Sequence, residues 1–351
     1  MNQKYDYGIV IGRFQPFHLA HQSLIQHSLT LAERVIVILG SARSAPDVKN
    51  PFTPAMREEI IRACFPNEAH RLVFRAVRDY PYNDHVWTAE IQNIVSEIVE
   101  EDENAEHARI AVFGFFKDKS SYYLNLFPQW NFEEFYSSDK KLLSSNATVI
   151  REKYFTAGDD AWRELVPETV ARYLDVFKTT EFFAPLASEF EYIRKYKQDT
   201  QFIGVPFAPV FVTTDAVVVQ SGHVLVVRRR VHPGKGLLAL PGGFLAPDQT
   251  LEDSMIRELK EETQIKVPAP VLRGSIKNSH AFDYPDRSAR GRTVTFAYFI
   301  ELEPSLKDGL PRVKGGDDAA KAFWLALSAL GEKEDEFFED HLHIVKYFLG
   351  M

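Results

Sequence analysis

Short apolar runs alternate with amphipathic stretches through the first 115 residues, and this alternation constrains the fold more than any other feature of the chain. The apolar runs predict strands at 8–12, 34–40, 71–76 and 109–115, and the amphipathic stretches predict helices at 18–32, 54–64 and 85–100. Strands and helices in this order form a doubly wound parallel sheet of the α/β class. Such sheets bind ligands beyond the carboxyl ends of their strands, where Gly12, Gly40 and Gly114 are expected.

A different pattern begins near residue 190. Two apolar runs, 209–219 and 222–228, flank a short turn and predict a hairpin, and 293–300 predicts a further strand. The regular alternation of strand and helix is missing there, so we expect a mixed sheet between helices. A chain of 351 residues is long enough for two domains. We predict a first domain at 1–185, a connector at 186–205 and a second domain at 206–351.

The charge and the cysteine content narrow the class of protein. A formal net charge of −8 and an isoelectric point near 5.8 argue against binding of long nucleic acids, which requires a basic surface. Cys64 is the only cysteine, so an intramolecular disulfide and a cysteine-based zinc site are both excluded. The apolar run at 8–11 is too short for a signal peptide or a membrane span. We therefore expect a cytoplasmic protein with no membrane partner, acting on small nucleotides.

The segment 12–21 places two histidines at the start of a predicted helix. His18 and His21 are three residues apart and therefore lie on one side of the first helical turn. The N–H groups and the dipole at a helix start attract phosphate, and imidazoles can donate to the charge that develops on departing pyrophosphate. This pattern favours nucleotidyl transfer without a protein nucleophile. The alternative is that one histidine only caps or packs the helix.

A second cluster of charged residues follows the turn Pro241-Gly242-Gly243. Glu258, Glu261 and Glu262 share one face of a predicted helix, and Arg257 is spaced to hold Glu261. Carboxylate oxygens select Mg²⁺ or Mn²⁺, which neutralise a diphosphate and activate water. The spacing indicates metal-dependent cleavage of a diphosphate. An acidic, solvated helix face is the alternative.

The first motif, Gly-x-Phe-x-Pro-x-His-x-x-His, resembles that of the nucleotidyltransferase superfamily, which has a Rossmann-like fold. The segments 40–42, 50–57, 83–87 and 146–151 are similar to those of archaeal-type nicotinamide mononucleotide (NMN) adenylyltransferases, although Asn146 and Ala147 stand where two serines are usual. The resemblance implies adenylyl transfer from ATP to NMN, giving NAD and pyrophosphate, with His18, His21 and Arg151 as catalytic residues. It further implies that ATP and NMN are bound by Gly12, Arg13, Phe14, Gly40, Ser41, Asn50, Phe52, Thr53, Arg57, Asn83, Asp84, Trp87, Gly114, Lys117, Asp118, Asn146 and Thr148. Trp87 is expected to stack on the pyridine ring, with a core position as its alternative.

The second motif resembles the Nudix box, with two departures. Gln249 stands where the first glutamate is expected, and Gln264 stands where glycine is usual. The resemblance implies that Glu258, Glu262 and the Gly242 carbonyl bind Mg²⁺ or Mn²⁺, and that Glu258 and Glu261 are catalytic. Gln249 removes a negative charge near the metal, and Gln264 must fill a left-handed cap that suits glycine better.

Two loops after the Nudix box are similar to those of the ADP-ribose-handling branch of that family. The first supplies three arginines within six residues, and the second supplies two aspartates. The resemblance implies that ADP-ribose is bound by Arg287, Arg290, Arg292, Asp317 and Asp318. A solvated hairpin tip for the arginines and a helix cap for the aspartates are the alternatives.

Together the two motifs match the bifunctional NMN adenylyltransferase/Nudix hydrolases of bacteria. We expect the first domain to make NAD and the second to hydrolyse ADP-ribose to AMP and ribose 5-phosphate. Two alternatives stay open: a second domain that only senses ADP-ribose or NAD, and a transferase that uses a pantetheine or flavin phosphate as acceptor. The sequence also leaves a homo-oligomer open.

Overall fold

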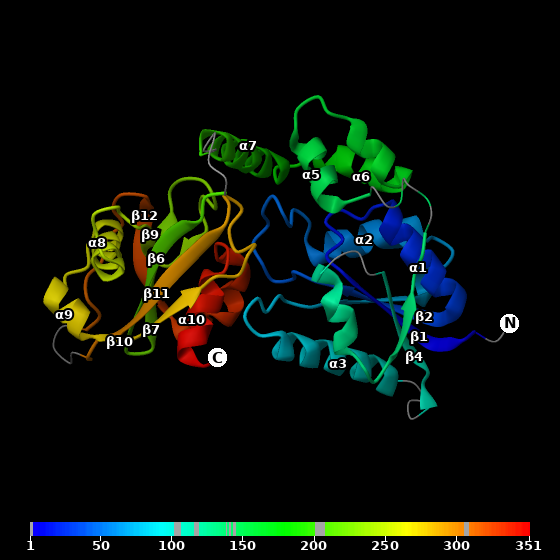
Figure 1. Ribbon diagram of the computed structural model, residues 1–351, viewed down its shortest axis with the longest axis horizontal. Helices are drawn as coiled ribbons and strands as arrows, with labels where there is room; N and C mark the ends of the chain where they lie inside the picture. The colour runs from blue at the N-terminus through cyan, green and yellow to red at the C-terminus, as the bar shows by residue number, and fades with distance from the viewer. Residues whose placement is uncertain are drawn as a thin grey trace. The chain divides into compact units, whose positions relative to one another are not determined.

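The computed structural model describes residues 3–101, 107–115, 119–137, 139, 142, 145–200, 208–304 and 309–351. It separates the chain into two compact units, Met1–Ala187 (unit 1) and Ser188–Met351 (unit 2). Helix α7, Phe183–Asp199, runs across this boundary, so much of the predicted connector is helical (Figure 1). Among the helices of the described residues, none combines the length and the apolar character needed to cross a bilayer.

Unit 1 is built on a five-stranded parallel sheet in the order β3-β2-β1-β4-β5. Its strands are β1 Tyr5–Gly12, β2 Ala32–Leu39, β3 Leu72–Ala76, β4 Ile110–Gly114 and β5 Asn131–Glu134. The predicted parallel sheet is confirmed, with β5 as an additional strand. The strand order reverses between β1 and β4, which is where parallel sheets open a crevice for ligands.

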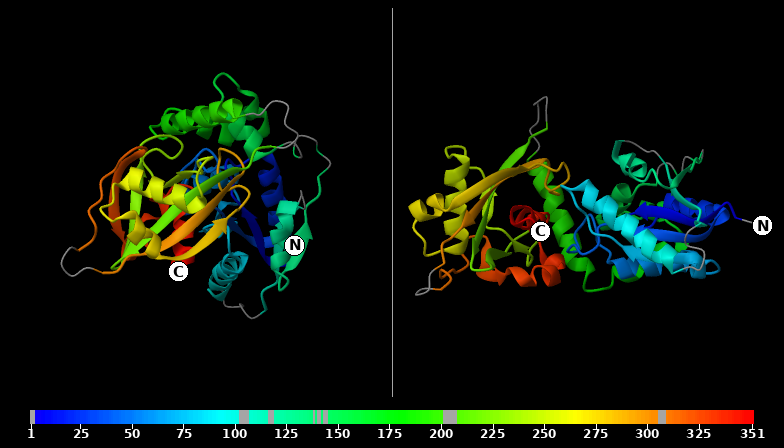
Figure 2. Two further views of the ribbon diagram at one scale, coloured as in Figure 1. Left: turned by 60° about the vertical axis from the view of Figure 1, so that its left-hand side comes forward. Right: turned by 90° about the horizontal axis from the view of Figure 1, so that it is seen from below.

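Helices connect these strands, and their apolar faces form the core of unit 1. They are α1 Leu19–Leu31, α2 Pro54–Cys64, α3 Asp84–Glu100, α5 Ala147–Phe155 and α6 Glu168–Phe177, with short 3-10 segments η1 Ala69–Arg71, η3 Lys119–Leu126 and η4 Ala161–Leu165. Ile91, Val95 and Ile98 of α3 pack on one face of the sheet, against Ile9 and Val112. This core holds the sheet whose strand ends carry the first site. Figure 2 shows α3, in cyan, beside the blue strands of unit 1.

Unit 2 contains a seven-stranded mixed sheet, as predicted. Its strands are β6 Phe211–Gln220, β7 His223–Arg229, β8 Leu238–Ala239, β9 Gly242–Phe244, β10 Ile276–Phe282, β11 Thr293–Glu301 and β12 Ala319–Ala326. The order is β10-β11-β6-β7-β12, with β8 beside β7 and β9 beside β6. The β11–β6 pair is parallel and the other pairs are antiparallel.

Helices cover both faces of this sheet. They are α8 Leu251–Thr263, α9 Ala269–Gly274 and α10 His341–Leu349, with 3-10 segments η5 Leu327–Ala329 and η6 Gly331–Glu336. Leu259 of α8 packs in one core cluster with Ile300 of β11, whereas Phe348 of α10 stacks on the adjacent Phe299 with ring centroids 5.6 Å apart. Neighbouring residues of a strand point to opposite faces, so α8 and α10 lie on opposite sides of the sheet.

Candidate active sites

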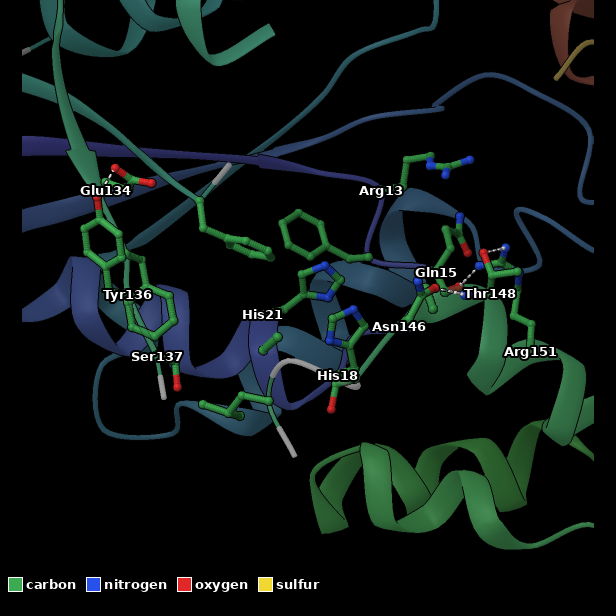
Figure 3. A pocket seen from close by; sticks show the side chains of 17 residues that line it. Arg13, Gln15, His18, His21, Glu134, Tyr136, Ser137, Asn146, Thr148 and Arg151 are labelled. Carbon is green, nitrogen blue, oxygen red and sulfur yellow. Dashed lines mark hydrogen bonds between the residues drawn. The ribbon is translucent and has the colours of Figure 1, made fainter. Parts of the chain in front are cut away.

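Unit 1 has a cavity of about 520 Å³ beyond the carboxyl ends of β1, β4 and β5. Seven of the predicted residues line it: Arg13, Phe14, His18, His21, Asn146, Thr148 and Arg151. In Figure 3, Glu134, Tyr136 and Ser137 lie at one end of this cavity and Arg13, Thr148 and Arg151 at the other, with the two histidines between them. The volume is in the range of pockets that hold a small ligand.

The two histidines stand together at the start of α1. His18 is the N-cap residue, and its ring stacks on that of His21 with centroids 3.6 Å apart and planes at 24°. Phe14 and Phe17 pack against the His21 ring at 4.8 and 5.8 Å and fix its orientation. The prediction that both imidazoles lie on one side of the first turn is confirmed.

Arg151 brings a buried positive charge to the same cavity. It is 8% exposed, and its Nη1 donates to the Gln15 carbonyl oxygen at 2.6 Å. Burial, together with the nearby charge of Arg13, lowers the pKa of Arg151 to about 10. Two guanidinium groups close together are unfavourable in a partly buried place unless an anion offsets them. This end of the cavity therefore suits a polyphosphate.

Arg57, which was expected to bind a nucleotide, supports the backbone of two loops. Its side chain is 1% exposed, and Nη1 donates to the carbonyl oxygens of Arg13 at 2.7 Å and Gly40 at 2.6 Å. Burial lowers the pKa of Arg57 to about 10. Arg57 is not among the residues that line the cavity, and its Nη1 is taken by the two loop carbonyls after β1 and β2. Its binding of a nucleotide stays a prediction.

Several other predicted nucleotide ligands also lie outside the cavity lining. Thr53 and Asn83 are N-caps that accept from the N–H groups of Met56 and Val86, since a residue that can bind phosphate can equally satisfy a free helix N–H. The remaining positions outside the lining are Gly12, Gly40, Ser41, Asn50, Phe52, Asp84, Trp87 and Gly114. Lys117 and Asp118 fall outside the described residues.

Two of these positions are held by side chains that the sequence analysis did not single out. Ser41 has a left-handed φ of 51°, and its N–H and hydroxyl both donate to the Asp79 carboxylate, at 3.1 and 2.6 Å. The Gln15 amide exchanges two hydrogen bonds with the Phe52 backbone, at 2.8 and 3.0 Å. Asp79 and Gln15 thus shape the loops around the first site.

Trp87 and Asp84 do not line this cavity, and both contact residues in or next to η3. Trp87 is half-buried, and its ring lies 6.0 Å from those of Tyr123 and Phe127. Asp84 accepts from the Tyr122 hydroxyl at 2.8 Å. Trp87 therefore combines a core contact with a partly exposed ring that remains available for stacking.

The cavity also includes a segment that sequence reasoning missed. Glu134, the last residue of β5, lines it together with Phe135, Tyr136 and Ser137. The Phe135 N–H donates to the Gly114 carbonyl oxygen at 2.7 Å. No apolar run marks β5, because its residues are exposed or half-buried. The one available signal was the aromatic pair Phe135–Tyr136 in a polar stretch.

The second site lies where α8 meets the Gly-Gly strand β9. Glu262 is 7% exposed, and its Oε2 accepts from the Gly242 N–H at 3.1 Å. A Cβ added to Gly243 would lie 2.5 Å from Glu258 Oε1, and one added to Gly242 would collide with Thr214 and Asp215. Glycine is therefore required at Gly242, where the backbone of β6 leaves no room for a side chain, and the missing side chain at Gly243 leaves room for the Glu258 carboxylate.

Arg257 braces more of this site than predicted. It donates to Glu261 at 2.7 Å and to Glu258 at 2.8 Å, and its Nε donates to Gln249 Oε1 at 3.0 Å. The side chain of Glu261 is 47% exposed and that of Glu258 is 13% exposed. Glu261 therefore faces outward, while Glu258 and Glu262 face the Gly-Gly strand.

The two inward carboxylates are suited to a divalent cation. Burial raises the pKa of Glu262 to about 8, and burial also raises the pKa of Glu258. A cation between them would offset the cost of two buried negative charges. Within the described ranges no group of three or more His, Cys, Asp or Glu side chains surrounds one point. The predicted set of Glu258, Glu262 and the Gly242 carbonyl still consists of the hard oxygen donors that Mg²⁺ and Mn²⁺ prefer.

The three arginines predicted to bind ADP-ribose have different surroundings, and their role in binding stays a prediction. Arg287 is 7% exposed and makes a two-bond ion pair with Asp340, at 2.9 and 2.7 Å. Arg292 donates to the Asp283 carbonyl oxygen in the loop itself. The Arg290 guanidinium alone lies over a residue of β9, 5.1 Å from the Phe244 ring centroid.

The aspartate loop lies beside the carboxyl end of α8. The Gly316 N–H donates to the Glu262 carbonyl oxygen at 2.9 Å, and the charge of Asp317 contributes to the raised pKa of Glu258. The segment continues into β12, so the alternative of a helix cap is wrong. Gln264 has φ 46° and ψ 31° at the end of α8, which confirms the expected left-handed cap.

Two family models match the chain, one in each unit. A cytidylyltransferase-like model matches residues 9–115, and a NUDIX domain model matches residues 210–348. The first covers β1 to β4 and the His18–His21 pair, and the second covers the Gly-Gly strand, α8 and most of α10.

Individual relatives are similar to each unit separately. A nicotinamide/nicotinic acid mononucleotide adenylyltransferase of Acinetobacter baylyi is 36% identical over 188 residues, which are 53% of this chain and 94% of that protein. An ADP-ribose pyrophosphatase of Methanocaldococcus jannaschii is 29% identical over 138 residues, which are 39% of this chain and 72% of that protein.

One solved protein is similar over both units. A bifunctional NMN adenylyltransferase/ADP ribose pyrophosphatase of Francisella tularensis is 33% identical, with a TM-score of 0.88 and coverage of 99% of both chains. A second crystal structure of that protein, complexed with AMP and a manganese ion, gives 32% identity and the same TM-score.

Proposed function

Because the chain belongs to the family of bifunctional NMN adenylyltransferase/ADP-ribose pyrophosphatase proteins, we propose that unit 1 makes NAD and that unit 2 cleaves ADP-ribose. The similarity to the Francisella protein over 99% of both chains carries this proposal, since it spans both sites at once. The stacked histidines support the first activity, and the buried carboxylate pair beside the Gly-Gly strand supports the second.

In unit 1 the 5′-phosphate of NMN attacks the α-phosphorus of ATP, and pyrophosphate leaves. His18 and His21 in the middle of the cavity, with Arg13 and Arg151 at one end, bind the phosphates and stabilise the charge that moves onto pyrophosphate. The start of α1, where His18 is the N-cap, adds free N–H groups and a favourable dipole for the same phosphates. No side chain has to form a covalent intermediate.

The aromatic end of the cavity is the place we propose for a base. Phe135 and Tyr136 line it together with Phe115, and aromatic rings stack on bases. We retain Trp87 as the partner of the pyridine ring. The acceptor is NMN or its acid counterpart, because the Acinetobacter relative is named for both mononucleotides. The other acceptors considered above, pantetheine and flavin phosphates, have no counterpart among these relatives.

In unit 2 we propose that Glu258, Glu262 and the Gly242 carbonyl hold Mg²⁺ or Mn²⁺, which neutralises the diphosphate and activates water. Arg257 keeps Glu258 and Glu261 in place through its ion pairs. Arg290 is the arginine best placed to meet the substrate, and Asp317 stands near Glu258. The products are AMP and ribose 5-phosphate.

The full-length protein tests both halves in one experiment. With ATP, Mg²⁺ and either NMN or nicotinic acid mononucleotide, chromatography should show the corresponding dinucleotide and pyrophosphate. With ADP-ribose and Mg²⁺ or Mn²⁺, it should show AMP and ribose 5-phosphate. Absence of the dinucleotide with both acceptors would reject the first activity, and ADP-ribose that binds without turnover would make unit 2 a sensor.

Two further expectations stay predictions. A cytoplasmic location is tested by fractionating cells that express the protein. Homo-oligomerisation is tested by sedimentation of the full chain, where a mass above 40.2 kDa would reveal it.

A further inference from the structure

The backbone just before Gly242 changes partners within two residues. β8, Leu238–Ala239, pairs with β7, whereas β9, Gly242–Phe244, pairs with β6. Leu240 and Pro241 form the crossing between the two ladders. Proline has no N–H, and the Leu240 N–H is buried and lies beyond the last pair of the β7–β8 ladder. A buried N–H at such a crossing requires an acceptor from elsewhere.

His341, the first residue of α10, supplies that acceptor from 101 residues away. Its Nδ1 accepts from the Leu240 N–H at 3.0 Å, and the side chain is 7% exposed. Burial lowers the pKa of His341, which keeps the ring neutral and leaves Nδ1 able to accept. The next N–H along the chain, that of Gly242, donates to Glu262. The turn is thus held by His341 on one side and by a carboxylate of the proposed metal site on the other.

The start of α10 is anchored independently. Asp340, its N-cap residue, makes the buried two-bond ion pair with Arg287. Phe338, which precedes the helix, donates its N–H to the Leu238 carbonyl oxygen at 2.8 Å. The backbone that carries the imidazole is therefore fixed by contacts of two residues just before the helix, so that the ring can act as a rigid support.

We propose that His341 is a positioning residue for the diphosphate-cleaving site, holding the Leu240–Pro241 crossing so that the Gly242 carbonyl and the Glu262 carboxylate face the same cation. None of its atoms has to touch substrate or metal. Its effect passes through one backbone hydrogen bond to the turn that supplies a proposed ligand. The inference rests on the proposed hydrolase site in unit 2.

His341→Asn and His341→Gln are similar in polarity but place the hydrogen-bond acceptor differently. Comparing them tests whether the acceptor matters or whether the side chain only fills the space. In His341→Asn the amide oxygen takes the place of Nδ1, whereas in His341→Gln the polar atoms lie one bond farther out, near the place of Nε2. His341→Leu removes the acceptor altogether. His343→Leu, two residues along the same helix, is the matched control.

The readout is Mn²⁺ binding to the full-length protein without substrate, titrated by electron paramagnetic resonance, with Glu258→Gln as the baseline. We expect His341→Leu and His341→Gln to raise the half-saturating Mn²⁺ concentration about 10- to 100-fold, the usual effect of removing a support behind a ligand. His341→Asn and His343→Leu should stay within about threefold of the unaltered protein by the same scale. NAD formation by unit 1 should be unchanged in all four variants and reports that unit 1 is folded, while thermal unfolding of each variant reports whether unit 2 is folded.

Equal Mn²⁺ binding by the Asn and Gln variants, whether strong or weak, would overturn the proposal. If His341→Leu does not fold, the Asn–Gln pair still decides it. Failure of the proposed function is a separate result, because unaltered protein that binds Mn²⁺ but leaves ADP-ribose intact would reject hydrolysis and leave the comparison of Mn²⁺ binding valid.

Discussion

Arg257 donates its Nε–H to Gln249 Oε1 at 3.0 Å, at the position where the Nudix box has a glutamate. The glutamine therefore keeps the hydrogen bond that a carboxylate would make to this arginine, and only the charge is lost. The same guanidinium also donates to Glu258 and Glu261. Arg257 therefore still holds these two glutamates, although glutamine replaces the first glutamate of the motif.

Gln249→Glu should therefore strengthen cation binding without rebuilding the site. The added negative charge lies next to the Arg257–Glu258 pair. Because the site is partly exposed, water weakens the interaction, and the Mn²⁺ affinity should change only severalfold. Mn²⁺ titration of the two proteins measures the change. Gln249→Leu, which removes the acceptor, should weaken binding; if the Leu variant binds as well as the Glu variant, Gln249 has no part in the site.

Gln264→Gly should stabilise unit 2 by about 1 kcal/mol. Gln264 holds a left-handed φ of 46°, which costs a residue with a Cβ roughly that amount, whereas glycine adopts it freely. Gln264→Ala keeps the strained backbone and removes the side chain, so it should give no gain. Chemical denaturation of the three proteins checks this, and equal stability of the Gly and Ala variants would contradict it.

Arg57→Leu should destabilise unit 1 by roughly 2 to 5 kcal/mol, because it leaves the buried carbonyls of Arg13 and Gly40 without their donor. Glu59→Leu on the same helix is the control. The Glu59 side chain is exposed, so its replacement should cost less than about 1 kcal/mol. Thermal unfolding measures both. Unchanged stability of Arg57→Leu with loss of ATP binding would return Arg57 to the set of ligands.

Cation binding in unit 2 should strengthen as the pH rises to about 8. Burial raises the pKa of Glu262 to about 8, so below that pH the metal-free carboxyl is mostly protonated and a cation must displace the proton. The apparent Mn²⁺ affinity should rise by up to about tenfold per pH unit and level off above the pKa. Titrations at pH 6, 7, 8 and 9 test this, with Glu262→Gln expected to remove the rise; a flat profile for the unaltered protein would be inconsistent with it.

The strands and helices that the sequence revealed are those with a strong local pattern. Helix α2 has the predicted bounds Pro54–Cys64, because Thr53 caps it, proline opens it and its apolar residues recur at helical spacing. β5 was missed, since an exposed edge strand of four residues has neither an apolar run nor alternation. The regular alternation of strands and helices correctly predicted the parallel sheet of unit 1, and the loss of that alternation correctly predicted the mixed sheet of unit 2.

The candidate sites were predictable where the chemistry is local. His18 and His21, or Glu258 and Glu262, are brought together by one helix, so their spacing alone predicts their proximity. The ion pair of Arg287 is made with Asp340, which is 53 residues away, and no local sequence pattern could indicate that pair. At Thr53 and Asn83 the sequence could not distinguish phosphate binding from helix capping, because the same residue types do both.

The central claim is that one chain carries two independent sites, and nucleotide chromatography of the full-length protein with two single substitutions tests it most directly. Supplied with ATP, NMN, ADP-ribose and Mg²⁺, His21→Ala should form NAD about 10²- to 10³-fold more slowly and cleave ADP-ribose at the unaltered rate. Glu258→Gln should do the reverse. If either substitution lowers both rates equally, or if the unaltered protein forms no NAD, the account of two separate activities is contradicted.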